Sequence, residues 1–99
     1  MGKKESDFQT KLIEKLQDKF PDSIILKNDE TYCQGIPDLS IFYKKHWAML
    51  EVKRNKNAVR RPNQDFYVSK ANEMSFARFI YPENEEEVLN DLEQAFCKN

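Results

Sequence analysis

The sequence predicts one α/β domain with a mixed sheet, an α+β arrangement in which the elements follow the order αβββαβα. Three segments place apolar residues at helical spacing. Four shorter runs, interspersed with these segments, are rich in β-branched and aromatic residues. The chain has 99 residues and no internal repeat or linker, so a single compact domain over residues 1–99 is expected.

The first helix is expected over residues 5–19. Ser6 and Gln9 have the spacing of a capping box that would open it. At about 100° per residue, Glu5 projects with the apolar stripe, whereas Asp7 and Glu14 project to the opposite side. The stripe itself consists of Phe8, Leu12, Ile13, Leu16 and Phe20. Glu5 is therefore the acidic side chain that we expect to point inward.

Three strands are expected next, after Pro21 and Asp22 end the helix. Residues 24–26 read as a short buried strand, and residues 28–35 form a polar loop. Residues 36–43 and 47–53 are separated by a short link, which predicts an antiparallel hairpin.

The hairpin register decides whether two acidic residues meet. A turn centred between Lys44 and Lys45 places Asp38 directly opposite Glu51, with Lys53 on the same face. Opposed residues have Cβ atoms roughly 4.5 to 5.5 Å apart, within reach of one shared cation. A bulge near Pro37 would shift this register, and a one-residue slip would put the acids on opposite faces.

The rest of the chain predicts a helix, a strand and a helix. Pro62 can begin the second helix, in which Tyr67, Ala71 and Met74 share a face and Gln64 lies near the edge. Residues 76–81 read as the fourth strand. The third helix begins with glutamates suited to the positive end of its dipole. Its expected buried residues are Val88, Leu89, Leu92 and Phe96.

Composition restricts the class of protein. No apolar run approaches the ~18 residues needed to cross a bilayer, and the N-terminus is followed by an amphipathic segment instead of a signal peptide, so an intracellular protein is expected. Cys33, Cys97 and His46 are too few for a structural zinc cluster, and both cysteines are expected to be free thiols. The net charge of −1 hides an acid-free basic run over residues 53–61.

Asp38, Glu51 and Lys53 carry the chemistry. Phosphodiester hydrolysis needs an activated water and a cation that neutralises the charge developing on the phosphate. Two carboxylates that hold a divalent metal, with one ammonium beside them, supply both. This pattern favours a nuclease.

Glu5, the Pro37-Asp38 pair, the Glu51-Val52-Lys53 run and Gln64 together resemble the PD-(D/E)xK nuclease superfamily. The expected element order also matches its restriction-endonuclease-like core. The Gly-Ile-Pro-Asp-Leu and Leu-Glu-Val-Lys signatures are most similar to stand-alone virus-type VRR-NUC domains, relatives of Holliday junction resolvases. The resemblance spans nearly the whole chain.

This resemblance implies roles for particular residues. Asp38 and Glu51 would bind Mg²⁺ or Mn²⁺, with the Val52 carbonyl as a further ligand. Lys53 would orient or activate the water, and Glu5 would support the metal site. Gln64 is assigned to the catalytic site mainly on the family pattern.

The resemblance also implies a substrate and a setting. Such proteins are similar to homodimeric, structure-specific endonucleases that cut branched DNA such as Holliday junctions, and they occur largely in phages and prophages. A role in the bacterial cytoplasm follows from it. DNA contacts are expected from the basic run and from one loop tyrosine, namely Lys53, Arg54, Lys56, Arg60, Arg61 and Tyr32.

Other interpretations stay open on the sequence alone. Asp38 could cap a strand end, Glu5 could serve only the helix dipole, and Gln64 and the basic run could simply be solvated. The same fold could be a catalytically silent DNA-binding accessory module. The acidic residues 83–93 could instead dock a basic partner.

Overall fold

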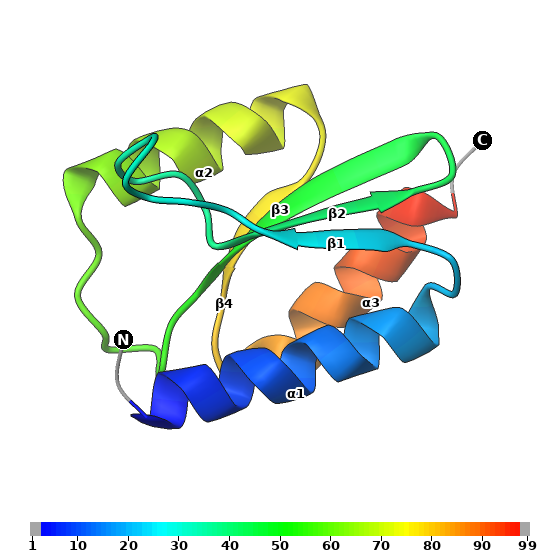
Figure 1. Ribbon diagram of the computed structural model, residues 1–99, viewed down its shortest axis with the longest axis horizontal. Coiled ribbons are helices and arrows are strands. Elements are labelled where there is room, and N and C mark those ends of the chain that lie inside the picture. The colour runs from blue at the N-terminus through cyan, green and yellow to red at the C-terminus, as the bar shows by residue number, and fades with distance from the viewer. Residues whose placement is uncertain (1–2, 98–99) are drawn as a thin grey trace.

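A computed structural model describes residues 3–97 and confirms the predicted order αβββαβα (Figure 1). The structure is an α+β fold with three helices and a four-stranded mixed sheet in this range. The elements are α1 (Lys3–Lys19), β1 (Ile24–Lys27), β2 (Leu39–Tyr43), β3 (His46–Val52), α2 (Pro62–Met74), β4 (Ala77–Ile80) and α3 (Glu85–Phe96).

The strands lie in the order β1-β2-β3-β4. The first three are antiparallel neighbours, and β4 joins β3 in parallel after the crossover through α2. The predicted hairpin register is confirmed, since Leu39 pairs with Leu50 and Tyr43 pairs with His46. Lys44 adopts a positive φ of 57°, the backbone conformation that a tight hairpin turn needs.

Two layers of helix cover the sheet. Helices α1 and α3 lie together on one face, and α2 lies on the other (Figure 1). The larger core lies between the sheet and helices α1 and α3, where residues such as Leu12, Leu50 and Leu92 are fully buried. In α3, the four expected core residues Val88, Leu89, Leu92 and Phe96 are all buried, as predicted.

A smaller core lies under α2, and here the expected helix face is partly wrong. Val68 and Ala71 pack with Ala77 and Phe79 of β4, whereas Met74 is 65% exposed. Gln64, expected near the edge of the apolar face, is only 8% exposed. The face turned to the sheet is therefore rotated toward Gln64, and α2 presents this polar side chain to the interior.

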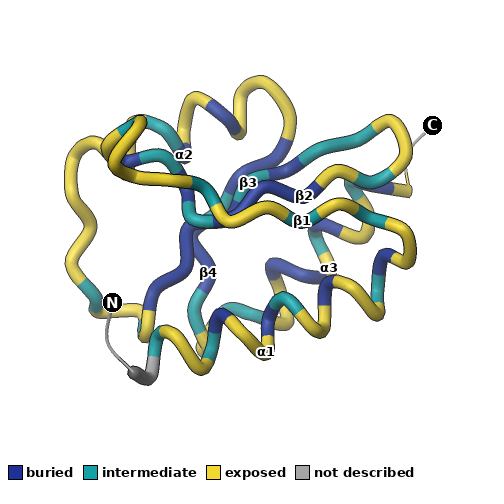
Figure 2. The backbone as a smooth tube through the Cα atoms, in the orientation of Figure 1, coloured by how far each residue is buried: buried dark blue, intermediate teal, exposed yellow. Residues whose placement is uncertain are grey.

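Two further expectations are corrected. The strand at residues 24–26 is not buried, because β1 is an edge strand that α2 does not cover, and Ile24 and Leu26 are 60% and 48% exposed (Figure 2). Ser6 does not cap α1, because the helix already begins at Lys3. The Ser6 carbonyl instead accepts a hydrogen bond from the Thr10 hydroxyl inside the helix.

Within residues 3–97, none of the helices has the length and apolar character required to cross a membrane. Cys33 and Cys97 are both free thiols, as expected.

Candidate metal and phosphate site

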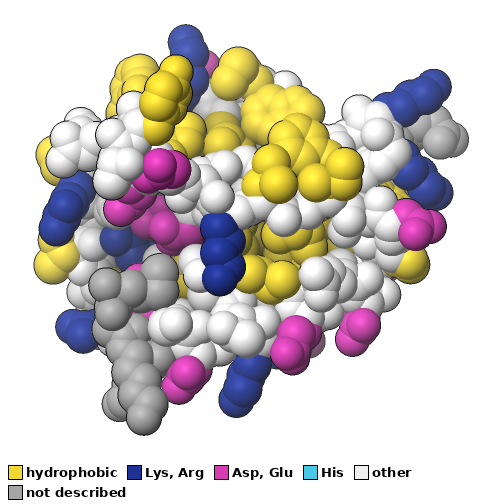
Figure 3. Space-filling model, in the orientation of Figure 1, with side chains coloured by type: hydrophobic (Ala, Val, Ile, Leu, Met, Phe, Trp, Pro, Cys, Tyr) yellow, Lys and Arg dark blue, Asp and Glu magenta, His cyan; other side chains and the backbone are white. Residues whose placement is uncertain are grey.

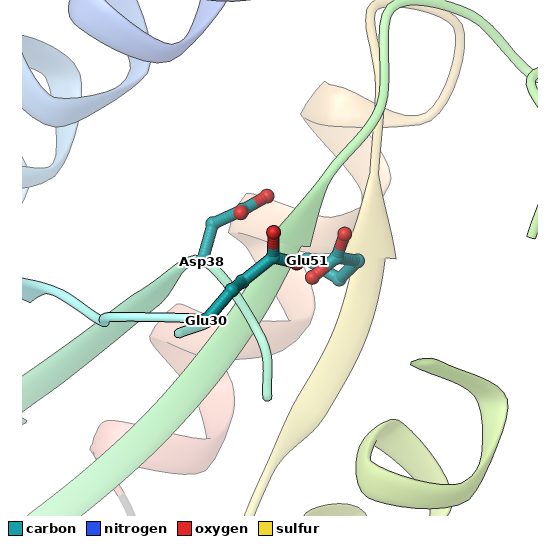
Figure 4. A group of neighbouring side chains, drawn as sticks. All are labelled: Glu30, Asp38 and Glu51. Atoms are coloured by element: carbon teal, nitrogen blue, oxygen red, sulfur yellow. The ribbon is translucent and has the colours of Figure 1, made fainter. Parts of the chain in front are cut away.

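Three carboxylates from different segments converge at one end of the sheet. Glu30 comes from the loop after β1, Asp38 directly precedes β2, and Glu51 lies near the end of β3. One oxygen from each side chain lies within 4.8 Å of the other two (Figure 4). This spacing suits a single hard divalent cation, which prefers oxygen ligands.

Asp38 is placed by the hairpin register. One carboxylate oxygen, Oδ2, accepts a 2.9 Å hydrogen bond from the Val52 backbone N–H. The bond leaves Oδ1 for another partner. It also holds Asp38 beside Glu51, as the predicted register requires. Val52, whose carbonyl was expected to bind the metal, therefore contacts the site through a hydrogen bond from its backbone N–H to Asp38.

Glu30 was not among the residues predicted from the sequence. Glu30 reaches the site because hydrogen bonds from Asn28 hold the beginning of the loop after β1 against the start of β2. The Asn28 backbone N–H donates to the Asp38 carbonyl at 2.8 Å, and its side-chain amide donates to the Pro37 carbonyl and the Ser40 hydroxyl, both at 2.8 Å. The only sequence signal was an acidic residue in a polar loop, which is common without any site.

The loop is also held against the start of α2. Gly35 has a φ of +92°, and a Cβ at this position would lie 2.4 Å from Asn63 Cβ and 2.9 Å from the Asn63 backbone carbon. Neither the backbone conformation nor the space admits a side chain. The glycine therefore allows the loop that carries Glu30 to approach the helix that carries Gln64.

Gly35→Ala should lower the free energy of unfolding by about 1 to 3 kcal/mol, because the new methyl group must displace backbone. The same displacement moves Glu30, so Mn²⁺ affinity measured by isothermal titration calorimetry should fall about 10-fold. Val88→Ala is the control, since Val88 is buried in the other core. If both variants lose stability and both keep the wild-type Mn²⁺ affinity, the loop does not contribute to the metal site.

Burial and like charge raise the carboxyl pKa values in the metal-free protein. Burial is the largest cause for both acids. It raises the pKa of Asp38 to about 6, and the charges of Glu30 and Glu5 act in the same direction. It raises the pKa of Glu51 to about 8, with the charge of Asp38 as the next cause. A nearby divalent cation would reverse this destabilisation of the ionised forms.

Among residues 3–97, no group donates a hydrogen bond to one of the two oxygens of Glu51. Glu51 is only 2% exposed, and its Oε1 is buried without a hydrogen bond from any residue in the described range. The other oxygen, Oε2, accepts a 3.1 Å hydrogen bond from the Gln64 amide. Buried carboxylate oxygens normally have a partner, so Oε1 is suited to a ligand that the protein itself does not supply.

Gln64 joins Glu51 to Lys53. Its carbonyl oxygen accepts hydrogen bonds from the Lys53 ammonium at 2.8 Å and from the Arg61 backbone N–H at 3.0 Å. Lys53 also donates to the Val59 carbonyl at 2.9 Å and lies 3.8 Å from Glu51 Oε2. The sequence placed Gln64 here only by the family pattern. The structure brings it into direct contact with both motif residues.

Glu5 turns inward, as predicted, and lines the same cavity as Asp38, Glu51 and Lys53, which has a volume of about 520 Å³. It does not join the three carboxylates whose oxygens lie within 4.8 Å of one another. Asp7 and Glu14 are exposed, as their helical phase predicts. Glu5 is therefore placed to act on the site through its charge and not as one of the close ligands.

The predicted DNA-contacting residues fall into two groups. Lys53 is buried and already bonded, so it belongs to the interior of the site and not to an open basic surface. Arg54, Lys56 and Arg61 are exposed, and Tyr32 is 93% exposed. Arg60 is exposed and its guanidinium lies 4.0 Å from the centre of the Phe79 ring. Figure 3 shows acidic side chains with lysines and arginines nearby on this part of the surface.

Comparisons with protein-family models, with curated proteins and with solved structures gave no match to this chain, so its assignment depends on the residues and geometry of the site.

Proposed function

We propose that this protein is a metal-dependent endodeoxyribonuclease of the PD-(D/E)xK type. One observation carries the proposal. Buried Glu51, whose Oε1 accepts no hydrogen bond within the described part of the chain, lies in a cluster of three carboxylates with the Lys53 ammonium fixed beside it. Carboxylates alone would suit many cation sites. The adjoining ammonium adds a second positive group, which favours an anionic substrate such as a phosphodiester.

The residues fit a Mg²⁺ or Mn²⁺ ion. Asp38, Glu51 and Glu30 offer hard oxygen ligands, and the Val52 carbonyl is an expected further ligand. A cation would also meet the two needs that the protein leaves open, namely the buried oxygen of Glu51 and the crowding of negative charge. When bound, the metal would supply Lewis-acid stabilisation of the charge that develops on the phosphate.

The protein groups would position the other reactants. Lys53 has three N–H donors, of which Val59 and Gln64 accept two. The third can orient a water or contact a phosphate oxygen. In-line attack of a water oriented in this way would form a new P–O bond and break the bond to the 3′ oxygen. The water would release one proton to solvent and the 3′ oxygen would take one up, leaving a 5′-phosphate and a 3′-hydroxyl. Gln64, which bonds both side chains, would hold the Lys53 ammonium and the Glu51 carboxylate in fixed positions during the reaction.

DNA is the proposed substrate because the exposed basic residues follow directly after the site. Arg54, Lys56, Arg60 and Arg61 lie between β3 and the first turn of α2. Each phosphate contact contributes an affinity that falls with salt. The proposal extends the family resemblance to branched DNA, with action in the bacterial cytoplasm on phage-derived DNA.

The test is a cleavage assay with purified protein on labelled four-way junction, flap, single-stranded and linear duplex DNA. Each substrate is incubated with Mg²⁺, Mn²⁺ or EDTA. Metal-dependent cuts placed symmetrically in the junction support the proposal. Binding in all metals with no product in any of them would overturn it and favour a DNA-binding module without hydrolytic activity.

We also propose that the protein acts as a homodimer. Strands β1 and β2 carry exposed apolar side chains on the face that points away from the larger core. Ile24, which is 60% exposed, pairs across the strands with Phe42, which is 43% exposed. Leu26 lies on the same face at 48% exposure, and Figure 3 shows hydrophobic side chains gathered over this part of the sheet. A second copy would cover this surface, and two sites are needed to cut two strands of a junction.

The double variant Ile24→Glu, Phe42→Glu should weaken self-association at least ~10-fold, because it places charges in the centre of an apolar contact. Sedimentation equilibrium of the wild type and the variant measures this. Val59→Glu is the control, since Val59 is 80% exposed and lies in the loop between β3 and α2. A wild type that stays monomeric at all accessible concentrations would rule out the dimer.

A further inference from the structure

We infer that a second cavity, beside the carboxylate cluster, binds one unpaired nucleobase of the substrate, next to the phosphate that is cut. The inference rests on the proposed nuclease function and narrows its substrate class. It predicts that the enzyme requires a nucleotide that is free of its partner strand, or that can be turned out of the duplex.

The two cavities are adjacent and share a wall. The second cavity has a volume of about 340 Å³ and lies between the loop at residues 30–35 and the start of α2. Glu30, Arg61 and Gln64 line both cavities. A DNA strand whose phosphate lies at the carboxylates therefore has its neighbouring nucleotide within reach of the second cavity.

The lining suits the edge of a base. The side chains that belong to this cavity alone are Thr31, Gln34 and Asn63, which are all exposed and together offer hydroxyl and amide groups. Arg61 adds a guanidinium. Amide, hydroxyl and guanidinium groups recognise the donor and acceptor pattern of bases. An apolar ligand would find no hydrocarbon side chain in this lining.

The position of the cavity, between a loop and a helix, favours a base that has left its duplex. A volume of 340 Å³ lies at the low end of the range for small-molecule sites. At one wall of the cavity the loop and the helix approach closely, since a side chain at Gly35 would clash with Asn63. A base inside a duplex is stacked and paired, so it must leave the stack before it can enter such a cavity.

Hydrogen bonds connect the lining of the base cavity to residues of the carboxylate site. Gln64, which lines both cavities, bonds Glu51 and Lys53 directly, and Arg61 donates its backbone N–H to Gln64. Base binding would thus fix the distance between the base and the phosphate. Such positioning would favour cleavage of DNA in which the nucleotide next to the cleaved phosphate is unpaired.

Fluorescence of 2-aminopurine tests the inference without any need for cleavage. The base analogue is placed at single positions of a flap or junction DNA, and the protein is added with Ca²⁺. One position, next to the cleavage site, should brighten at least 2-fold as its base unstacks. The variant Gln34→Ala, Asn63→Ala should lose this rise while its Mn²⁺-induced thermal shift stays at the wild-type value.

A cleavage arm separates this inference from the proposed function. Removing the base at that one position should slow wild-type cleavage about 10-fold and leave the double variant unaffected. Brightening without cleavage would support the base site and overturn the nuclease. Cleavage with no brightening at any position, or with equal rates on intact and abasic DNA, would overturn the base site alone. A double variant that still brightens the DNA would overturn it too.

Discussion

Asp38→Asn and Glu51→Gln are each expected to reduce metal-dependent DNA cleavage by at least ~10²-fold. Both changes remove a negative charge and keep the size of the side chain. They act on groups whose oxygens lie within 4.8 Å of each other and of Glu30, so the cation would lose a charged ligand. Interactions made mainly in the transition state affect cleavage far more than binding. DNA affinity in EDTA should therefore stay within about 3-fold of wild type.

Single-turnover cleavage and fluorescence anisotropy measure the two quantities separately. The control is Glu14→Gln, which makes the same chemical change on the exposed side of α1, and it should cut at the wild-type rate. Circular dichroism shows whether each variant is folded. Unchanged cleavage by both Asp38→Asn and Glu51→Gln would end the assignment of these residues to the reaction.

The second large effect is a loss of stability of the metal-free protein as the pH rises. Folding raises the pKa of Asp38 to about 6 and that of Glu51 to about 8, from 3.8 and 4.5. The folded state therefore holds protons that the unfolded state has released, and each carboxyl destabilises the fold as the pH passes through its folded pKa. One pKa unit corresponds to about 1.4 kcal/mol. Because the folded pKa of Asp38 lies about one unit above pH 5 and that of Glu51 about three units above it, the two groups should together cost on the order of 5 kcal/mol by pH 8.5.

Urea unfolding in EDTA across this range measures the effect. Glu51→Gln should remove the part of the decline between pH 6 and pH 8, because the amide cannot ionise. A saturating Mn²⁺ concentration should stabilise the wild type by about 3 kcal/mol at 100 times its dissociation constant. At one fixed Mn²⁺ concentration the gain should be larger at pH 8 than at pH 6, since the ligands must be deprotonated and the affinity rises with pH. A flat wild-type profile that matches Glu51→Gln would contradict the raised pKa values.

The sequence by itself determined the order of the elements and the register of the hairpin. A turn centred between Lys44 and Lys45 predicts the pairing of Leu39 with Leu50, and the structure has that pairing, in which Leu39, Ile41 and Leu50 are buried together. The same pairing places Asp38 next to Glu51. Local periodicity carries this information because a one-residue slip would expose the whole apolar face.

Helix faces were predictable only where a helix has one apolar stripe. In α3 the four expected core residues are buried, because its other side is strongly charged. In α2 the apolar and polar residues are less clearly separated, and the buried face includes Gln64 while Met74 lies outside it. Contacts with the sheet, and the hydrogen bonds that Gln64 makes to Glu51 and Lys53, decide the orientation of this helix.

Only the tertiary structure brought Glu30 to the site and left Ile24 exposed. Glu30 arrives through the hydrogen bonds of Asn28 and the close contact of Gly35 with Asn63, which join segments far apart in the sequence. Ile24 is exposed because α2 crosses over β3 and β4 and does not reach β1. Periodicity describes neighbours along the chain. It carries no information about which loop folds over a site or how far a helix covers a sheet.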